Sequence, residues 1–303
     1  MTDHVARIAV ILPVYNRKEI TLKCLGKLHE FDNTRYRLHF VLVDDGSPDG
    51  TGDAVREAYP NVDVLEGDGN LWWAGGVNKG FKYVADSVQC EYILLMNDDS
   101  NFNQSTLDVL FNYIKTKKNI CASATALYEF TNIIYCTGHS MNGRFKNMIP
   151  LFQGYEINEQ IPRIIKCDSI SSRFVLMPLK ILNEVGIFDE NKFKQSYSDI
   201  EYFLRAKKCG YENIVMTDSI LTTNANKSYM KYSFVNISRI QYLKSFISNK
   251  YDNNIKTIIM SSIMHRDNVN AMLLLIRNML SIIKMLSIKI LMPKCLVYRL
   301  MNK

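Results

Sequence analysis

The sequence lacks the motifs that mark several common classes of protein. Seven cysteines are scattered through 303 residues with no C-x-x-C pair, which argues against a zinc site or disulfide framework and for reduced thiols in a cytosolic protein. No G-x-x-x-x-G-K-[ST] occurs, and no G-x-G-x-x-G follows the first apolar run, so P-loop and dinucleotide-binding folds are not favoured. The N-terminus runs directly into a strand-like segment, so we expect no signal peptide.

Acidic residues are almost missing from the C-terminal quarter of the chain. Residues 226–303 hold 13 Lys and Arg against two acids, a net charge of +11, whereas residues 1–225 carry a net −4. This asymmetry predicts an anionic partner for the C-terminal segment. Because that segment lacks the interleaved aromatics and modules of nucleic-acid-binding proteins, we expect a membrane and no nucleic acid.

A short apolar run at residues 92–96 stops abruptly at two adjacent carboxylates, Asp98 and Asp99. Such a run is typical of a strand buried in a parallel sheet, and ligands of open α/β sheets bind at the carboxyl ends of these strands. Two carboxylates there suit a hard divalent cation beside a substrate phosphate. The alternative from the residues alone is a helix cap formed by Asn97, Asp98 or Ser100.

The rest of the first hundred residues alternates between strand and helix patterns. The run at 38–43 also ends in carboxylates, at Asp44, and glycines and turn formers follow it. We therefore predict an α/β fold, a doubly wound and mostly parallel sheet with helices on both faces and a nucleotide-type crevice. The expected strands are 7–13, 38–43, 62–65, 92–96 and 120–127, and the expected helices are 19–31, 51–59, 77–84 and 104–118.

Beyond residue 127 the pattern is less regular. Residues 128–165 predict an inserted sheet or loop over the crevice, and residues 168–178 a strand. A helix begins near Tyr197 with acids in its first turn, where Asp199 could serve only as a cap or dipole partner.

The order of these parts resembles the family 2 glycosyltransferases with the GT-A fold, over residues 7–225. Each motif is weak alone, but five in order at strand ends and helix starts make a specific signal. The adjacent Trp72 and Trp73 resemble a motif of the bacterial polysaccharide or O-antigen-type subgroup of this family. The matching motifs are PVYNR at 13–17, DDGS at 44–47, NLWWAGGVN at 70–78, NDD at 97–99 and the 186–205 segment with Asp199.

The resemblance implies transfer of a sugar from a nucleotide diphosphate donor, usually with inversion. It implies that Asp98 and Asp99 hold Mn²⁺ or Mg²⁺, with Asp98 also near the ribose, and that the cation stabilises the leaving diphosphate. Asp199 takes the place of the general base. Donor contacts are further expected at Pro13, Tyr15, Arg17, Asp44, Gly76 and Lys79.

Two residues depart from the family pattern. Asn97 replaces the first Asp of the usual metal motif, and Ser198 stands where many members have Glu beside the base. Ser198 keeps open an alternative, a catalytically impaired nucleotide-sugar-binding or scaffolding subunit of a polysaccharide assembly complex. A sugar nucleotidyltransferase is not favoured, because it should carry a Gly-rich, Arg-containing loop where residues 13–17 stand.

The segment at 226–303 lies outside the resemblance and predicts a basic amphipathic helical tail. Arg277 and Lys284 fall on one arc of a helix at 269–300, and Met272, Leu275, Met279, Ile282 and Leu286 fall on the opposite arc. No uncharged run of 18 residues exists, so a spanning helix is not expected. The pattern favours an anionic bilayer surface; packing on the catalytic domain, or on a second subunit in a homodimer, is the alternative.

These observations predict two domains: a GT-A catalytic domain at 1–225 and the tail at 226–303. We expect an inverting, metal-dependent glycosyltransferase that moves a hexosyl or deoxyhexosyl group from a UDP- or dTDP-sugar to a hydroxyl of a polyprenyl-linked saccharide, in surface polysaccharide or capsule synthesis. Its expected location is the cytoplasmic face of the cell membrane.

Overall fold

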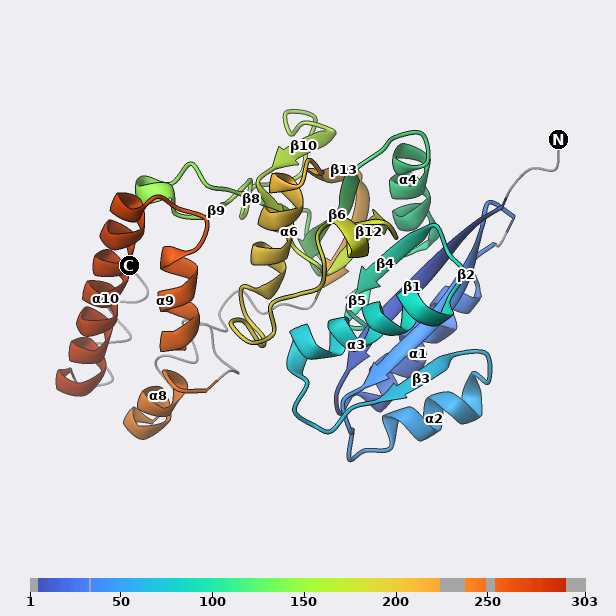
Figure 1. Cartoon of the computed structure of the whole chain (residues 1–303), viewed down its shortest axis with the longest axis horizontal. Coiled ribbons are helices and arrows are strands. Elements are labelled where there is room, and N and C mark those ends of the chain that lie inside the picture. The colour runs from blue at the N-terminus through green and yellow to red at the C-terminus, as the bar shows by residue number, and fades with distance from the viewer. Residues whose placement is uncertain (1–4, 33, 224–237, 249–253, 293–303) are drawn as a thin grey trace. The chain divides into compact units, whose positions relative to one another are not determined.

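The apolar runs of the first 223 residues form one ten-stranded sheet (Figure 1). The computed structural model describes residues 5–32, 34–223, 238–248 and 254–292. The sheet strands are β1 (Ala6–Val14), β2 (Tyr36–Asp44), β3 (Asp63–Glu66), β4 (Tyr92–Met96), β5 (Ser100–Asn101), β6 (Ile120–Tyr128), β7 (Ile134–Cys136), β10 (Ile164–Cys167), β12 (Phe174–Pro178) and β13 (Glu212–Thr223). The shorter strands are β8 (Gly138–Ser140), β9 (Ile149–Pro150) and β11 (Ser169–Ile170).

Strand order places β4 and β1 near the middle of the sheet, in the sequence β10-β13-β6-β12-β4-β1-β2-β3. The first four strands run parallel, so their carboxyl ends meet at one edge. Strand β12 is antiparallel to both β4 and β6, and it brings the residues just before it to the end of β4. The sheet edge therefore collects residues distant in sequence.

Alternating side chains of β1 enter two separate cores, one on each face of the sheet. Ile8, Val10 and Leu12 pack with α1, α2 and α4, whereas Ala9 and Ile11 pack with α3 and α6. The α/β class with helices on both faces is thus confirmed. The helices of this part are α1 (Lys18–His29), α2 (Thr51–Ala58), α3 (Trp72–Ser87), α4 (Gln104–Ile114), α5 (Ile181–Glu184) and α6 (Ser198–Lys208).

The chain divides into two compact units. The first comprises Met1–Ser140, Pro150–Lys194 and Ser198–Asn224, and the second Met141–Ile149, Gln195–Tyr197 and Ala225–Lys303. The predicted boundary between residues 225 and 226 lies outside the described residues and stays a prediction. The second unit contains η1 (Arg144–Lys146), α8 (Arg239–Ser245), α9 (Ile255–Ile263) and α10 (Asn268–Leu291).

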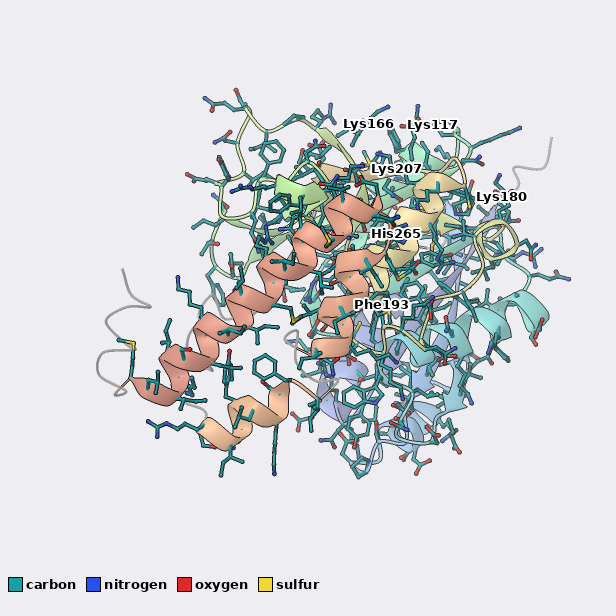
Figure 2. The ribbon with its side chains drawn as sticks, turned by 60° about the vertical axis from the view of Figure 1, so that its left-hand side comes forward. Lys117, Lys166, Lys180, Phe193, Lys207 and His265 are labelled. Carbon is teal, nitrogen blue, oxygen red and sulfur yellow. The ribbon has the colours of Figure 1, made fainter. Side chains whose placement is uncertain are left out.

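Within the second unit, α9 and α10 lie side by side, with His265 at the turn between them (Figure 2). Ile282 and Leu286 of the predicted apolar arc pack against Tyr242 of α8 and Phe246 directly after it. Met272, placed on the same arc, is instead exposed. Part of the apolar arc is therefore used inside the unit.

A second apolar row on α10 remains exposed. Its members follow the 3–4-residue spacing of one helix face and are 49–63% exposed: Val269, Met272, Ile276, Leu280 and Ile283. Among the described residues, α10 alone is long and apolar enough to cross a membrane, by length and composition only. Helix α10 contains charged residues, so it does not meet the stricter criterion of an uncharged run of 18 residues, on which the sequence prediction of no spanning helix was based.

Helix α3 approaches β1 closely because two of its glycines face that strand. A Cβ at Gly80 would come 2.6 Å from Cγ2 of Ile11, and one at Gly76 would come 3.0 Å from Cβ of Pro13. This contact sets the position of the loop that enters α3.

We predict that Gly80→Val lowers the free energy of unfolding by about 1–3 kcal/mol, because the buried side chain of Ile11 cannot yield without strain. Urea denaturation measures the loss. Lys82→Val, on the exposed side of the same helix, is the control and should cost clearly less. Equal losses in both variants would contradict close packing at Gly80.

Candidate active site at the end of strand β4

Asp98 and Asp99 stand at the carboxyl end of β4, where the sequence predicted them. The Asp98 side chain is 2% exposed and that of Asp99 is 34% exposed. The first carboxylate is therefore part of the protein interior, and the second faces solvent.

Both carboxylates are held by cationic and hydroxyl donors. Arg17 Nη1 lies 3.0 Å from Asp98 Oδ1 and 3.2 Å from Asp99 Oδ2. Thr21 donates its hydroxyl to the other Asp98 oxygen at 2.8 Å, one helical turn beyond Arg17 on α1. Arg173 Nη1 lies 3.0 Å from Asp99 Oδ1. We call Arg17, Asp98, Asp99 and Arg173 the β4 cluster.

Burial raises the pKa of the Asp98 carboxyl above its ordinary value, because the charged form has lost its water. The positive charge of Arg17 and the hydrogen bond from Thr21 act in the opposite direction but do not cancel it. Burial also disfavours the charged Arg17, yet the charges of Asp98 and Asp99 outweigh this and raise the pKa of Arg17.

The loops after β1 and β2 are fastened to each other beside this cluster. Asn16 N donates to Ser47 Oγ at 2.8 Å, and Arg17 N donates to Thr51 Oγ1 at 3.4 Å. Asp44 Oδ1 accepts from Ser47 N at 3.0 Å, and its Oδ2 accepts from Gly52 N at 2.8 Å. Asp44 is buried and braces this loop; its predicted contact with the base stays a prediction.

Asp45 organises the loop that enters α3. Its two carboxylate oxygens accept from the backbone N–H groups of Gly69, Leu71 and Trp72 at 2.9–3.1 Å. This role was not foreseen, although a second carboxylate beside Asp44 was the available signal. Trp72 is half-buried, and its ring N–H donates to Asn70.

The other predicted donor contacts lie along the same edge. Pro13 is the second-last residue of β1, paired with Val43, and Tyr15 directly follows the strand with 53% of its surface exposed. Gly76 is buried against Pro13, and Lys79 is half-buried one turn further along α3. Their donor contacts stay predictions.

Asp199 lies in the first turn of α6 and is oriented by the segment before β12. Ser172 donates to Asp199 Oδ2 through its N–H at 3.3 Å and its hydroxyl at 3.4 Å. The neighbouring residue in the chain is Arg173 of the β4 cluster. Residues 172 and 173 thus connect the predicted base with the predicted metal carboxylates. Neither the Ser172 contact nor the Thr21 contact was predicted.

His139, on β8, lies close enough to Asp199 for the two side chains to interact electrostatically. Burial lowers the pKa of the imidazole, and the negative charge of Asp199 opposes this only in part. A neutral ring beside Asp199 leaves the carboxylate without a fixed positive counter-charge from this side.

The donor set at the end of β4 fits a divalent cation held together with a substrate. Asp99 offers a solvent-facing carboxylate, and the buried Oδ1 of Asn97 has no hydrogen-bond partner within the described part of the chain. Two or three oxygen donors with remaining positions for phosphate suit Mg²⁺ or Mn²⁺. In the described residues no group of three or more His, Cys, Asp or Glu is placed to hold a metal by itself.

Comparison with known proteins agrees with this geometry. The model of the glycosyl transferase family 2 matches residues 9–176, which include most of β1, the β4 cluster and most of β12. The chain belongs to glycosyl transferase family 2. The segment with Asp199 lies beyond the matched residues.

Two relatives match more than half of the chain. The low-salt glycan biosynthesis hexosyltransferase Agl10 of Haloferax volcanii is 21% identical over 64% of this chain and 63% of its own length. The N-acetylglucosaminyl-diphospho-decaprenol L-rhamnosyltransferase of Mycobacterium tuberculosis is 21% identical over 57% of this chain and 62% of its own length. The chain spans less than two thirds of the curated relatives that it first matches.

Among solved structures, the mannosyltransferase PcManGT from Pyrobaculum calidifontis, in complex with GDP-Man and Mn²⁺, has a TM-score of 0.55 and 14% identity. The match covers 99% of this chain and 88% of that one. At this identity the likeness concerns the fold, and the GT-A fold of the family 2 chain is confirmed.

We predict that Thr21→Val destabilises the protein by about 1–3 kcal/mol at neutral pH, because the buried Asp98 carboxylate loses a donor. The pKa of Asp98 is higher in the folded than in the unfolded state, so stability falls as pH rises through that pKa. Removing the hydroxyl raises the pKa further, so the loss should shrink in acid, where Asp98 is protonated.

Urea denaturation at several pH values measures this. Thr125→Val is the control, because its buried hydroxyl donates to the carbonyl of Met216, which does not titrate. A loss with the same pH dependence in both variants would contradict the assignment of the Thr21 contact to the ionised Asp98.

Proposed function

We propose that this protein is an inverting, metal-dependent glycosyltransferase that transfers a hexosyl or deoxyhexosyl group from a UDP- or dTDP-sugar. The single observation that carries the proposal is the pair Ser172 and Arg173, which brings Asp199 and the β4 cluster into one site. An inverting displacement needs one base for the acceptor and a separate group of charges for the leaving diphosphate. In the proposal, Asp199 is the base and the β4 cluster is the group of charges.

In this proposal each residue has a distinct task. Asp99, with Asp98 behind it, would hold a divalent cation, which supplies Lewis-acid stabilisation of the leaving diphosphate. Asp199 accepts the proton from the acceptor hydroxyl as its oxygen attacks the anomeric carbon. Ser172 keeps the Asp199 carboxylate oriented during that transfer. The bond from the sugar to the diphosphate breaks as the new glycosidic bond forms, and the configuration inverts.

We infer a lipid-linked saccharide as acceptor and a surface polysaccharide, such as an O-antigen or capsule, as product. The supporting observations are the names of relatives: the mycobacterial relative is named for a decaprenol-linked substrate, and a Bacillus spizizenii relative is a poly(ribitol-phosphate) beta-glucosyltransferase. The adjacent Trp72 and Trp73 at the entrance of α3 support the same subgroup.

We predict that Asp199→Asn lowers turnover by about 10²–10⁴-fold, because the acceptor proton loses its base. Binding of the nucleotide diphosphate with Mn²⁺ should be retained, since that site is the β4 cluster. Product formation and calorimetric titration measure the two quantities. Asp218→Asn, an exposed carboxylate paired with Arg163, is the matched control and should be fully active. Unchanged turnover in Asp199→Asn would contradict the assignment of Asp199 as the base, whereas a wild type that binds nucleotide without turnover would point to the scaffolding alternative.

We also propose that the second unit binds the anionic cytoplasmic surface of the cell membrane. Within this unit, the described residues at 238–248 and 254–292 carry seven Lys and Arg against one acid. That acid, Asp267, caps α10 and pairs with Lys146 at 2.8 Å, so little negative charge opposes the bilayer. The exposed apolar row of α10, with Arg277 and Lys284 next to it, is the proposed contact surface.

We predict that replacing Ile276 and Leu280 together by Ser weakens binding to anionic vesicles, because each exposed side chain loses about 1 kcal/mol or more of apolar burial. Vesicle sedimentation measures binding. Phe130→Ser, in an exposed turn of the first unit, is the control and should bind normally.

The same experiment tests the mode of attachment. Surface-bound protein is released from vesicles by high salt and alkaline washing, and retention after washing would support a spanning α10 instead. Equal binding of the double variant and the wild type would contradict the exposed row as contact surface.

A further inference from the structure

The β4 cluster contains as many positive as negative groups. Arg17 and Arg173 approach Asp99 at different carboxylate oxygens, at 3.2 Å and 3.0 Å. Both Asp98 oxygens are also used, one by Arg17 and one by Thr21. Each carboxylate oxygen that a cation would need therefore already has a donor from the protein.

Arg173 has one carboxylate partner among the described residues, Asp99, whereas Arg17 has two. Arg173 Nη1 also has a long contact to Thr223 Oγ1 at 3.4 Å, and its guanidinium interacts with the Tyr135 side chain, whose ring centre lies 5.4 Å away. Its side chain is 18% exposed, and its buried Nε–H has no hydrogen-bond partner among the described residues. A buried donor without an acceptor is unfavourable, so Arg173 has an unused capacity to bind an anion.

The net charge of the site indicates when Arg173 would bind an anion. A divalent cation added to Asp98 and Asp99 leaves the two guanidinium charges uncompensated in a half-buried site. The negative charges of a nucleotide diphosphate cancel this excess. Cation and diphosphate should therefore enter together, and the guanidinium released from Asp99 has a new partner within reach.

We propose that Arg173 is a counter-ion that occupies Asp99 until cation and diphosphate arrive, and that it then binds the diphosphate of the donor. The inference rests on the proposed function, because it names a further binding residue of the same site. Without nucleotide, Arg173 competes with the metal ion for Asp99. With nucleotide bound, Arg173 binds the diphosphate and no longer competes with the metal ion. A residue that merely braces Asp99 would not change its effect in this way.

The test measures two affinities in Arg173→Gln. Mn²⁺ binding without nucleotide, followed by electron paramagnetic resonance of the free ion, should become tighter, by about tenfold for a lost competitor of about 1.4 kcal/mol. Binding of UDP, dTDP or GDP in the presence of saturating Mn²⁺, followed by calorimetry, should become weaker by a similar factor. The expected result is therefore a tighter affinity for Mn²⁺ alone and a weaker affinity for the nucleotide.

Two further variants control the result. Arg173→Lys keeps the charge but not the fork of donors, so its metal affinity should stay nearer the wild type. Arg163→Gln removes an exposed arginine that pairs with Asp218 elsewhere in the same unit, and should change neither affinity. Thermal melting of each variant checks that it is folded.

The outcomes separate the inference from the proposed function. If wild type binds a nucleotide with Mn²⁺ but Arg173→Gln changes both affinities in the same direction, or neither, the counter-ion role is wrong and the proposed function stands. If wild type binds none of the nucleotides with Mn²⁺, the proposed function and the inference both fail.

Discussion

The ion pairs at the carboxyl end of β4 are the interaction on which the rest of the site depends. Two carboxylates in one sheet edge repel each other and lose hydration there, and Arg17 and Arg173 make that position tolerable. The parallel strands β1 and β4 bring Arg17 to this edge, and the antiparallel β12 brings Arg173. The topology of the sheet is thus what assembles the charges.

The same segment before β12 serves two carboxylates of different purpose. Ser172 fixes Asp199, the proposed base, and Arg173 fixes Asp99, the proposed metal ligand. A shift of this segment would move both at once. The site is built from β4, α6 and the loop after β1. These contacts fix its carboxylates without a complete set of metal ligands from the protein. This arrangement also places the proposed chemistry on strand ends, with the helices behind them as support.

The sequence was sufficient for strands β1 to β4 and β6, and for the position of Asp98 and Asp99 at the end of β4, because each of these strands contains an apolar run. It was insufficient for β13, which was not predicted. It was also insufficient for Thr21, Asp45 and Ser172, whose contacts join segments up to 77 residues apart and depend on the order of strands in the sheet. Helix α3 begins at Trp72, earlier than the predicted 77, because Asp45 accepts the N–H groups of its entry loop. Of the exposed row of α10 only Met272 was predicted, because two apolar faces exist and only packing shows which one is used inside the unit.

The central claim is that the end of β4 binds a nucleotide diphosphate together with a divalent cation. The most direct measurement is the melting temperature of the wild-type protein with UDP, dTDP and GDP, each with and without Mn²⁺, because a ligand that binds the folded state raises this temperature by mass action. The account predicts a clear rise with UDP or dTDP in the presence of Mn²⁺ and little change with nucleotide or metal alone. An unchanged melting temperature under every condition would contradict it.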